Sequence, residues 1–157
     1  MEEKDKAFMV TAIELSIESV KNNGGPFGAV IVKGGNILSK ASNSVTLNND
    51  PTAHAEINAI RGACAVLKSF DLSGCVIYTS CEPCPMCLGA IYWARIEKIF
   101  YANDRTDAKK IGFDDSFIYD ELVKPVSKRS IISVQIIKTE AIKAFNVWMQ
   151  KKDKIEY

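Results

Sequence analysis

A histidine and a pair of cysteines are the side chains of this chain with the clearest capacity for chemistry. His54 is the only histidine among 157 residues. Cys84 and Cys87 follow it in a Cys-Pro-Met-Cys sequence. Imidazole nitrogen and thiolate sulfur bind zinc well, and three protein ligands leave the fourth tetrahedral position open to water. The three residues therefore predict a zinc site that could activate water.

Glu56, two residues after His54, is the predicted proton carrier of that site. Zinc lowers the pKa of a bound water molecule to about 7, and a nearby carboxylate can take the proton and deliver it to a substrate. Residues two apart lie on different sides of a regular helix, so His54 and Glu56 share a site only if the metal lies beyond the helix end. A second helix, capped by Cys84 and opened by Pro85, would bring Cys87 to the same metal.

The cysteines also allow two other interpretations. A Cys-x-x-Cys pair between a strand and a helix is typical of a redox dithiol, but that interpretation leaves His54 and Glu56 unexplained. The second alternative is a closed structural zinc site, in which Cys81 is a fourth ligand and the protein is a binding module. Stoichiometric zinc would argue against the dithiol, and zinc retained after Cys81→Ser would argue for the open site.

Hydrophobic periodicity and turn residues predict an α/β fold around these residues. Residues 75–79 form a strand that is apolar on both faces, which indicates a central position in the sheet. A helix at 85–93 joins it to a strand at 98–102, and such strand-helix-strand units make parallel pairs. The other predicted elements are a helix at 5–21, hairpin strands at 27–33 and 36–42 separated by Gly34 and Gly35, a helix from residues 50–52 to about 68, short helices at 107–111 and 116–123, a strand at 131–138, and a C-terminal helix with Ala141, Phe145, Trp148 and Met149 on one face.

Composition and charge narrow the partners. The 157 residues, 47% hydrophobic, suffice for a single domain over residues 1–157. The 20 basic residues nearly balance the 19 acidic ones, so nucleic acid is not an expected partner. No apolar run approaches the length of a membrane span, and the charged residues 1–6 do not resemble a signal peptide. Five cysteines, three of them between 81 and 87, indicate reduced thiols and a cytoplasmic location.

Three further segments carry a family resemblance. They are residues 24–30 (Gly-Gly-Pro-Phe-Gly-Ala-Val), residues 48–56 (Asn-Asn-Asp-Pro-Thr-Ala-His-Ala-Glu) and residues 112–119 (Gly-Phe-Asp-Asp-Ser-Phe-Ile-Tyr), and Tyr157 ends the chain. Together with the zinc motifs, they make nearly the whole chain resemble the bacterial guanine deaminases of the cytidine deaminase superfamily. The zinc motifs alone would indicate only the superfamily, whose members also act on cytosine, on adenosine in tRNA or on guanosine.

The resemblance implies a three-layer α/β/α fold of the cytidine deaminase type, in which helices flank a mixed five-stranded sheet. It implies a zinc-dependent deaminase domain with one zinc ion per subunit, which hydrolyses the purine base guanine to xanthine and ammonia. It also implies a homodimer in which the C-terminal segment, about residues 130–157, is exchanged between subunits. Tyr157 would then contact the substrate bound to the partner subunit.

The resemblance also assigns roles that the spacing of residues does not show. Asn43 would hydrogen-bond the purine, and Asp115 would be a second proton carrier, acting on the departing amine. Phe27 and Phe113 would form walls around the base. Without the resemblance, Asn43 and Asp115 would be turn or cap residues, and Tyr157 would belong to a disordered end.

Two related activities stay open on the sequence. A tRNA-specific adenosine deaminase uses the same zinc chemistry, although the near-neutral charge of the chain argues against tRNA binding. A guanosine deaminase would differ in the room around N9 of the purine, which a sequence does not measure. Guanine is therefore the predicted substrate, with these two as alternatives.

Overall fold

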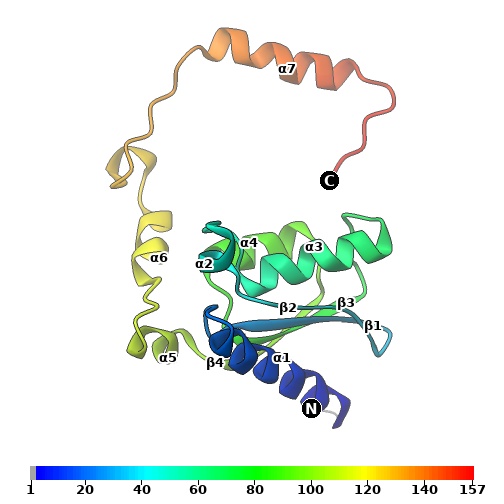
Figure 1. The fold of residues 1–157 in the computed structure, drawn as a ribbon. Coiled ribbons are helices and arrows are strands. Elements are labelled where there is room, and N and C mark those ends of the chain that lie inside the picture. Colours follow the sequence, from blue (N-terminus) through cyan, green and yellow to red (C-terminus); the bar gives the residue numbers. More distant parts are fainter. Residues whose placement is uncertain (1–2) are drawn as a thin grey trace. The chain divides into compact units, whose positions relative to one another are not determined.

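The computed structural model describes residues 3–157, which divide into two units (Figure 1). The first unit ends at Asp115 and contains the sheet, and the second runs from Ser116 to Tyr157. The elements of the first unit are α1 (Glu3–Lys21), β1 (Gly28–Lys33), β2 (Asn36–Ser42), α2 (Val45–Asn48), α3 (Ala55–Leu67), β3 (Cys75–Cys81), α4 (Pro85–Trp93), β4 (Lys98–Asn103) and α5 (Arg105–Lys110). The bounds of α1, α4 and the four strands lie within two residues of those predicted.

The strands form one mixed sheet in the order β2-β1-β3-β4. β1 pairs antiparallel with β2 and β3, whereas β3 and β4 run parallel, as predicted for a strand-helix-strand unit. The hairpin turn between β1 and β2 has φ angles of +56° at Gly34 and +80° at Gly35, which glycine adopts without steric cost. β3 lies inside the sheet and is almost entirely buried, which confirms its predicted central position.

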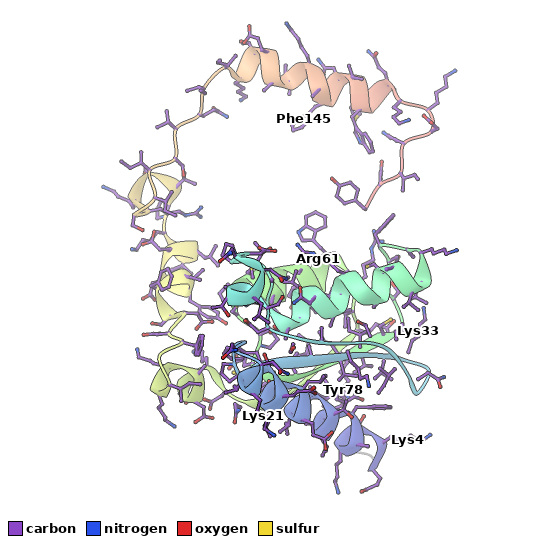
Figure 2. The ribbon with its side chains drawn as sticks, viewed as in Figure 1. Lys4, Lys21, Lys33, Arg61, Tyr78 and Phe145 are labelled. Carbon is purple, nitrogen blue, oxygen red and sulfur yellow. The ribbon has the colours of Figure 1, made fainter. Side chains whose placement is uncertain are left out.

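Helices cover both faces of the sheet, which confirms the predicted three-layer α/β/α fold. α1 packs on one face, and α3 and α4 cover the other (Figure 1). Side chains alternate between the two faces, so Ile31 and Ile77 join the core under α3, while Val30 and Tyr78 join the core under α1. The Tyr78 hydroxyl, on the α1 side in Figure 2, donates a hydrogen bond of 2.6 Å to Asp5.

The predicted fifth strand is wrong, because the sheet has four strands within residues 3–157. Residues 131–138 have a strand-like sequence, yet 131–137 form no strand and α7 begins at Lys138. The side chains of Ile131, Ile132 and Val134 are exposed. A strand requires a neighbour for its backbone hydrogen bonds, and the sequence of one segment does not say which sheet edge supplies that neighbour.

The second unit consists of helical segments. They are α6 (Ser116–Val123), the 3₁₀ turn η1 (Val126–Lys128) and α7 (Lys138–Gln150), and the two α-helices confirm the predictions for these segments. No residue of α6 or α7 is buried. Phe145 of α7, for example, is exposed (Figure 2). Among residues 3–157, no helix is both long enough and apolar enough to cross a bilayer.

Candidate active site

Two helix N-termini carry the predicted metal ligands. His54 is the N-cap of α3, and Cys84 is the N-cap of α4. α3 begins later than predicted, because Asp50 accepts hydrogen bonds from the backbone and the hydroxyl of Thr52 in a separate turn. His54 therefore lies at the helix end and Glu56 in the first turn. A metal beyond the helix end could bind His54 and still lie close to Glu56.

The ligand atoms of His54, Cys84 and Cys87 all lie within 4.8 Å of one another. Nδ1 of His54 is 3.6 Å from Sγ of Cys84 and 3.5 Å from Sγ of Cys87. Tetrahedral zinc, with bonds of about 2.3 Å to sulfur and about 2.0 Å to nitrogen, separates such atoms by roughly 3.5 Å. The distances and the donor types therefore fit a zinc ion with three protein ligands.

Glu56 is buried next to this cluster and is only 8% exposed. Burial raises the pKa of its carboxyl group, while the hydrogen bond with the Cys87 thiol acts in the opposite direction. A carboxyl group with a raised pKa is a better proton acceptor and donor near neutral pH than an exposed one. The position and burial of Glu56 therefore suit a proton carrier.

The two thiols of the cluster differ in acidity. A hydrogen bond from the Cys87 thiol lowers the pKa of Cys84 to about 4, and donation of this bond raises the pKa of Cys87. The hydrogen bond between His54 and Cys84 raises the pKa of the imidazole. Without metal and near neutral pH, the cluster therefore holds one thiolate, at Cys84, and one thiol, at Cys87.

Binding of zinc to the metal-free protein is expected to release protons. The ligands must be deprotonated, so about one proton should leave Cys87, and a further fraction should leave His54. Zinc affinity should fall as the pH drops through the raised pKa of His54, because protons then compete for the imidazole. Calorimetric titrations in buffers of different ionisation enthalpy count the protons. An unchanged count in Cys87→Ser would contradict this assignment.

Cys81 lies outside the ligand cluster. Its thiol donates to the carbonyl oxygen of Asp104 over 3.6 Å, and burial raises its pKa to about 11. It is not a member of the group formed by His54, Cys84 and Cys87. The geometry therefore favours an open site with three ligands over a closed site with four.

Asn43 is 6% exposed, and hydrogen bonds hold both its backbone N–H and its backbone carbonyl. Its N–H donates to the carbonyl of Phe27 over 3.0 Å, and its carbonyl accepts from the hydroxyl of Ser19 over 3.2 Å. Its side-chain Oδ1 accepts from the N–H of Val45 over 3.2 Å, which fixes the orientation of the amide. A Cβ atom at Gly25 would lie 3.0 Å from Cγ of Asn43, so glycine allows this close packing.

The remaining predicted residues divide between the two units. Phe27 and Phe113 meet edge to face, with ring centroids 5.0 Å apart and an interplanar angle of 87°. Asp115 lies close enough to the cluster that the charge on Cys84, after burial, contributes to raising its pKa. Tyr157 belongs to the second unit, so its role in the site stays a prediction.

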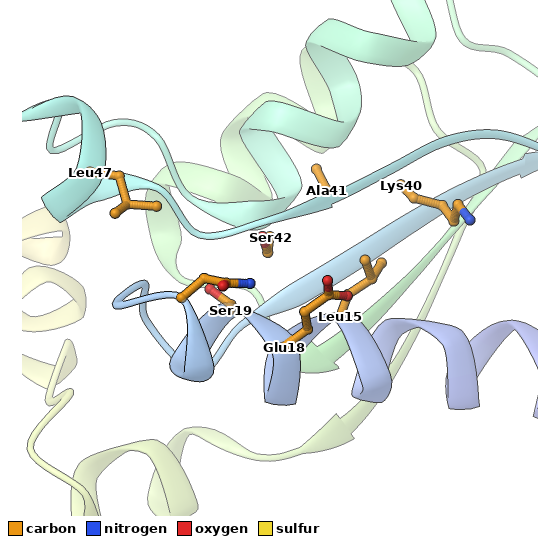
Figure 3. Close-up of a pocket in the computed structure, with 8 residues that line it drawn as sticks. Leu15, Glu18, Ser19, Lys40, Ala41, Ser42 and Leu47 are labelled. Atoms are coloured by element: carbon orange, nitrogen blue, oxygen red, sulfur yellow. The ribbon is translucent and has the colours of Figure 1, made fainter.

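A hollow of about 230 Å³ lies between α1 and β2 (Figure 3). Its lining includes Glu18 and Ser19 of α1 and Lys40 and Ser42 of β2. None of the lining residues belongs to the ligand cluster. The hollow is lined in part by Ser42, the residue before Asn43, and it is not the metal site.

The model of the cytidine and deoxycytidylate deaminase zinc-binding region matches residues 2–103. The chain belongs to this deaminase family. It is 54% identical over 153 residues to the guanine deaminase of Bacillus subtilis (strain 168), covering 97% of this chain and 98% of that relative. The X-ray structure of guanine deaminase from Bacillus subtilis superposes with a TM-score of 0.95 at 52% identity, covering 100% of this chain and 99% of the other. The tRNA-specific adenosine deaminase of Buchnera aphidicola subsp. Baizongia pistaciae (strain Bp) is 35% identical over 156 residues, 99% of this chain and 94% of that relative.

Two residues that hold the segment around Asn43 were not predicted from the sequence. Ser19 holds the backbone of Asn43, and Asn58 holds the residues on either side of it. Ser19 carries no signal in the sequence, because it lies within the predicted helix at 5–21 and its spacing does not distinguish it. Asn58 carried one, because it is an amide within the mostly apolar stretch that follows Glu56.

Proposed function

We propose that this chain catalyses the hydrolytic deamination of guanine to xanthine and ammonia. The observation that carries the proposal is the 54% identity to a guanine deaminase over 97% of the chain, well beyond the zinc-binding region at 2–103. The site supports it chemically, because a histidine and two cysteines at zinc distances lie beside a buried glutamate. Zinc nucleobase deaminases use this combination.

His54, Cys84 and Cys87 would hold one zinc ion per subunit. When bound, zinc supplies an activated water molecule as the nucleophile, since it lowers the pKa of water to about 7. Cys84 needs no proton removed to become a ligand near neutral pH, because its pKa is about 4. The N-terminus of α4, where both cysteines lie, also favours their thiolate forms.

Glu56 would take the proton of the attacking water and pass it to a ring nitrogen of guanine while oxygen adds to C2. Asp115 would then donate a proton to the exocyclic amine, the C2–N bond would break to release ammonia, and the proton of the new C2 hydroxyl would return to Asp115 as C2=O forms. The C2–O bond that forms turns the ring into xanthine, so guanine and one water molecule account for all product atoms. Both carboxyl groups have pKa values raised by burial, which suits proton transfer in both directions.

Asn43 would donate a hydrogen bond from its NH₂ group to an acceptor of the purine. Its Oδ1 already accepts from Val45, so the amide offers a donor in a fixed direction. Phe27 and Phe113, which contact each other, would form the walls around the base. Together these residues would select a flat ring with an acceptor facing Asn43.

Ammonia release from guanine by the zinc-loaded protein tests the proposed function. Guanosine, cytosine, adenosine and a tRNA stem-loop are tested in parallel, and Glu56→Gln is the inactive control. Turnover of guanine, with the other four substrates slower by at least about tenfold in kcat/KM, is the expected result. If only the stem-loop or guanosine reacts, the family stands and the substrate is wrong.

A tRNA-specific adenosine deaminase is the second candidate, since a protein of that name is 35% identical to nearly the whole chain. The formal net charge of +1 argues against it, because tRNA binding relies on neutralising several phosphates. The higher identity to guanine deaminase favours the purine base. The stem-loop in the assay decides between the two activities.

We propose that two subunits form a homodimer and exchange residues 130–157. The support is that α7 buries none of its residues, that residues 131–137 are strand-like but unpaired, and that β4 is an edge strand of its sheet. A second copy would supply the missing neighbour for each of these surfaces. Tyr157 would then complete the site of the partner subunit.

Co-expression of two inactive variants, Glu56→Gln and Tyr157→Ala, is expected to restore activity. In a mixed dimer with exchanged segments, one site combines an intact Glu56 with an intact Tyr157. Statistical pairing would return roughly a quarter of the wild-type activity. Differently tagged subunits verify that mixed dimers are present, and inactive mixed dimers would contradict contact in trans.

The reduced cysteines support a cytoplasmic enzyme. All five cysteines are free thiols, and three of them lie in or beside the ligand cluster. Oxidation of Cys84 and Cys87 to a disulfide with each other would remove two zinc ligands at once. A reducing compartment is therefore the setting in which the site would keep its metal.

A further inference from the structure

Asn58 donates hydrogen bonds to two separate parts of the chain. Its Nδ2 lies 3.0 Å from the carbonyl oxygen of Ser42, 3.0 Å from the hydroxyl oxygen of Ser44 and 3.3 Å from the carbonyl oxygen of Ala53. An amide NH₂ has two hydrogens, so three acceptors occupy its whole donor capacity. The first two acceptors flank Asn43.

Asn58 and His54 belong to the same rigid element. The N–H of Asn58 donates to the carbonyl of His54 over 3.0 Å, which is the first turn of α3. The segment that carries Asn43 lies between the end of β2, an edge strand, and the four-residue helix α2. Asn58 therefore ties a short connecting segment to the helix that positions a metal ligand.

One backbone hydrogen bond joins the same two parts. The N–H of Ser44 donates to the carbonyl of Ala53 over 2.9 Å, and Asn58 shares that acceptor. Asn58 adds two hydrogen bonds to this single backbone bond, so it restricts both the distance and the rotation of the Asn43 segment relative to α3. Reaction geometry is sensitive to such shifts, since a displacement of about 1 Å can cost about 100-fold in rate.

We propose that Asn58 is a positioning residue that sets the place of the Asn43 amide relative to the metal site, and so the grip of the enzyme on guanine. The inference rests on the proposed function and on the proposed contact of Asn43 with the purine. Asn58 acts through Asn43 and contributes no atom to the reaction. Its effect therefore depends on whether residue 43 can contact the substrate.

A double-mutant cycle on kcat/KM for guanine tests this dependence, using wild type, Asn58→Ala, Asn43→Ala and the double variant, all zinc-loaded. Asn58→Ala is expected to lower kcat/KM about tenfold, mainly through KM, in the wild-type background, and by no more than about twofold in the Asn43→Ala background. Equal losses in both backgrounds, or no loss in the first, would overturn the inference. If Asn58→Ala does not fold, Asn58→Asp takes its place in the cycle, since it keeps the shape and removes the donor.

Asn48→Ala is the matched control. Asn48 donates to the same Ser44 hydroxyl over 3.0 Å, but from α2, so it makes no link to α3. It is expected to keep kcat/KM within about twofold of wild type. A tenfold loss here would overturn the inference, because it would show that any loosening of Ser44 is sufficient.

A binding measurement separates this inference from the proposed function. The dissociation constant of guanine is measured in the Glu56→Gln background, where turnover is removed, with and without Asn58→Ala. It should rise about tenfold with Asn58→Ala while the zinc content stays unchanged. Absence of guanine turnover by zinc-loaded wild type would refute the proposed function. Normal turnover with an unchanged dissociation constant would refute the role of Asn58 alone.

Discussion

Replacement of Glu56 by Gln is expected to lower kcat for guanine by about 1,000-fold, because general acid–base catalysis contributes about 100-fold to 10,000-fold. The amide has nearly the shape of the carboxyl group and can still hydrogen-bond in the buried position. It cannot accept the proton of the attacking water. Zinc content should stay at the wild-type value, because Glu56 is not one of the three grouped ligands.

The pH profile gives the same prediction a second readout. Burial raises the pKa of Glu56 above 4.5, and the protonated acid cannot act as the base. Wild-type activity should therefore fall as the pH drops through this raised pKa, and that limb should be absent from the residual activity of Glu56→Gln. Zinc is measured at each pH so that metal loss is not mistaken for titration of Glu56. Full activity of a zinc-replete Glu56→Gln would refute its role.

The stability of the variant follows from the sign of the same shift. A carboxyl group whose pKa is raised in the folded state contributes stability that is fully present below its unfolded pKa and is lost as the pH rises through the folded value. At any pH above the folded pKa, the ionised Glu56 of the metal-free protein therefore opposes folding. Glu56→Gln removes that charge, so loss of activity should come without loss of the folded state.

The grouping of His54, Cys84 and Cys87 could be predicted from the sequence because their positions depend on local rules. Pro85 favours the first turn of a helix, and a helix that begins there places Cys84 and Cys87 at one end whatever surrounds it. The donor types then restrict the metal to a few ions. His54 has to lie near the start of a helix to reach the metal. It does so in the structure, although α3 begins later than predicted.

The elements that could not be predicted depend on distant partners. The pattern at 131–137 indicates side chains that suit a β-sheet. Whether the segment forms a strand depends on an available edge strand to pair with, which its own sequence does not specify. The Asp50 carboxylate can accept backbone hydrogen bonds either at a helix start or in a turn. In the structure it accepts from Thr52 in a turn. Asn58 matters through acceptors on Ser42 and Ser44, more than ten residues away, and no periodicity reveals such contacts.

Loss of a zinc ligand should have the second very large effect. Cys87→Ser is expected to weaken zinc binding by more than about 100-fold, because changes to groups that merely support ligands already cost about 10-fold to 100-fold. Turnover should fall to background in parallel, since no other group among the described residues of the site can activate water. Zinc is quantified after gel filtration, and activity is measured before and after zinc is added back.

Cys81→Ser is the matched control, because it removes a neighbouring thiol that is not in the cluster. The Cys81 thiol bonds to the carbonyl of Asp104, and a serine hydroxyl can donate to the same oxygen. Zinc content and kcat should therefore stay within about twofold of wild type. If Cys81→Ser instead loses zinc as Cys87→Ser does, the site has four protein ligands and no open position. A closed site of that kind would hold zinc for structure and leave Glu56 without a water molecule to activate.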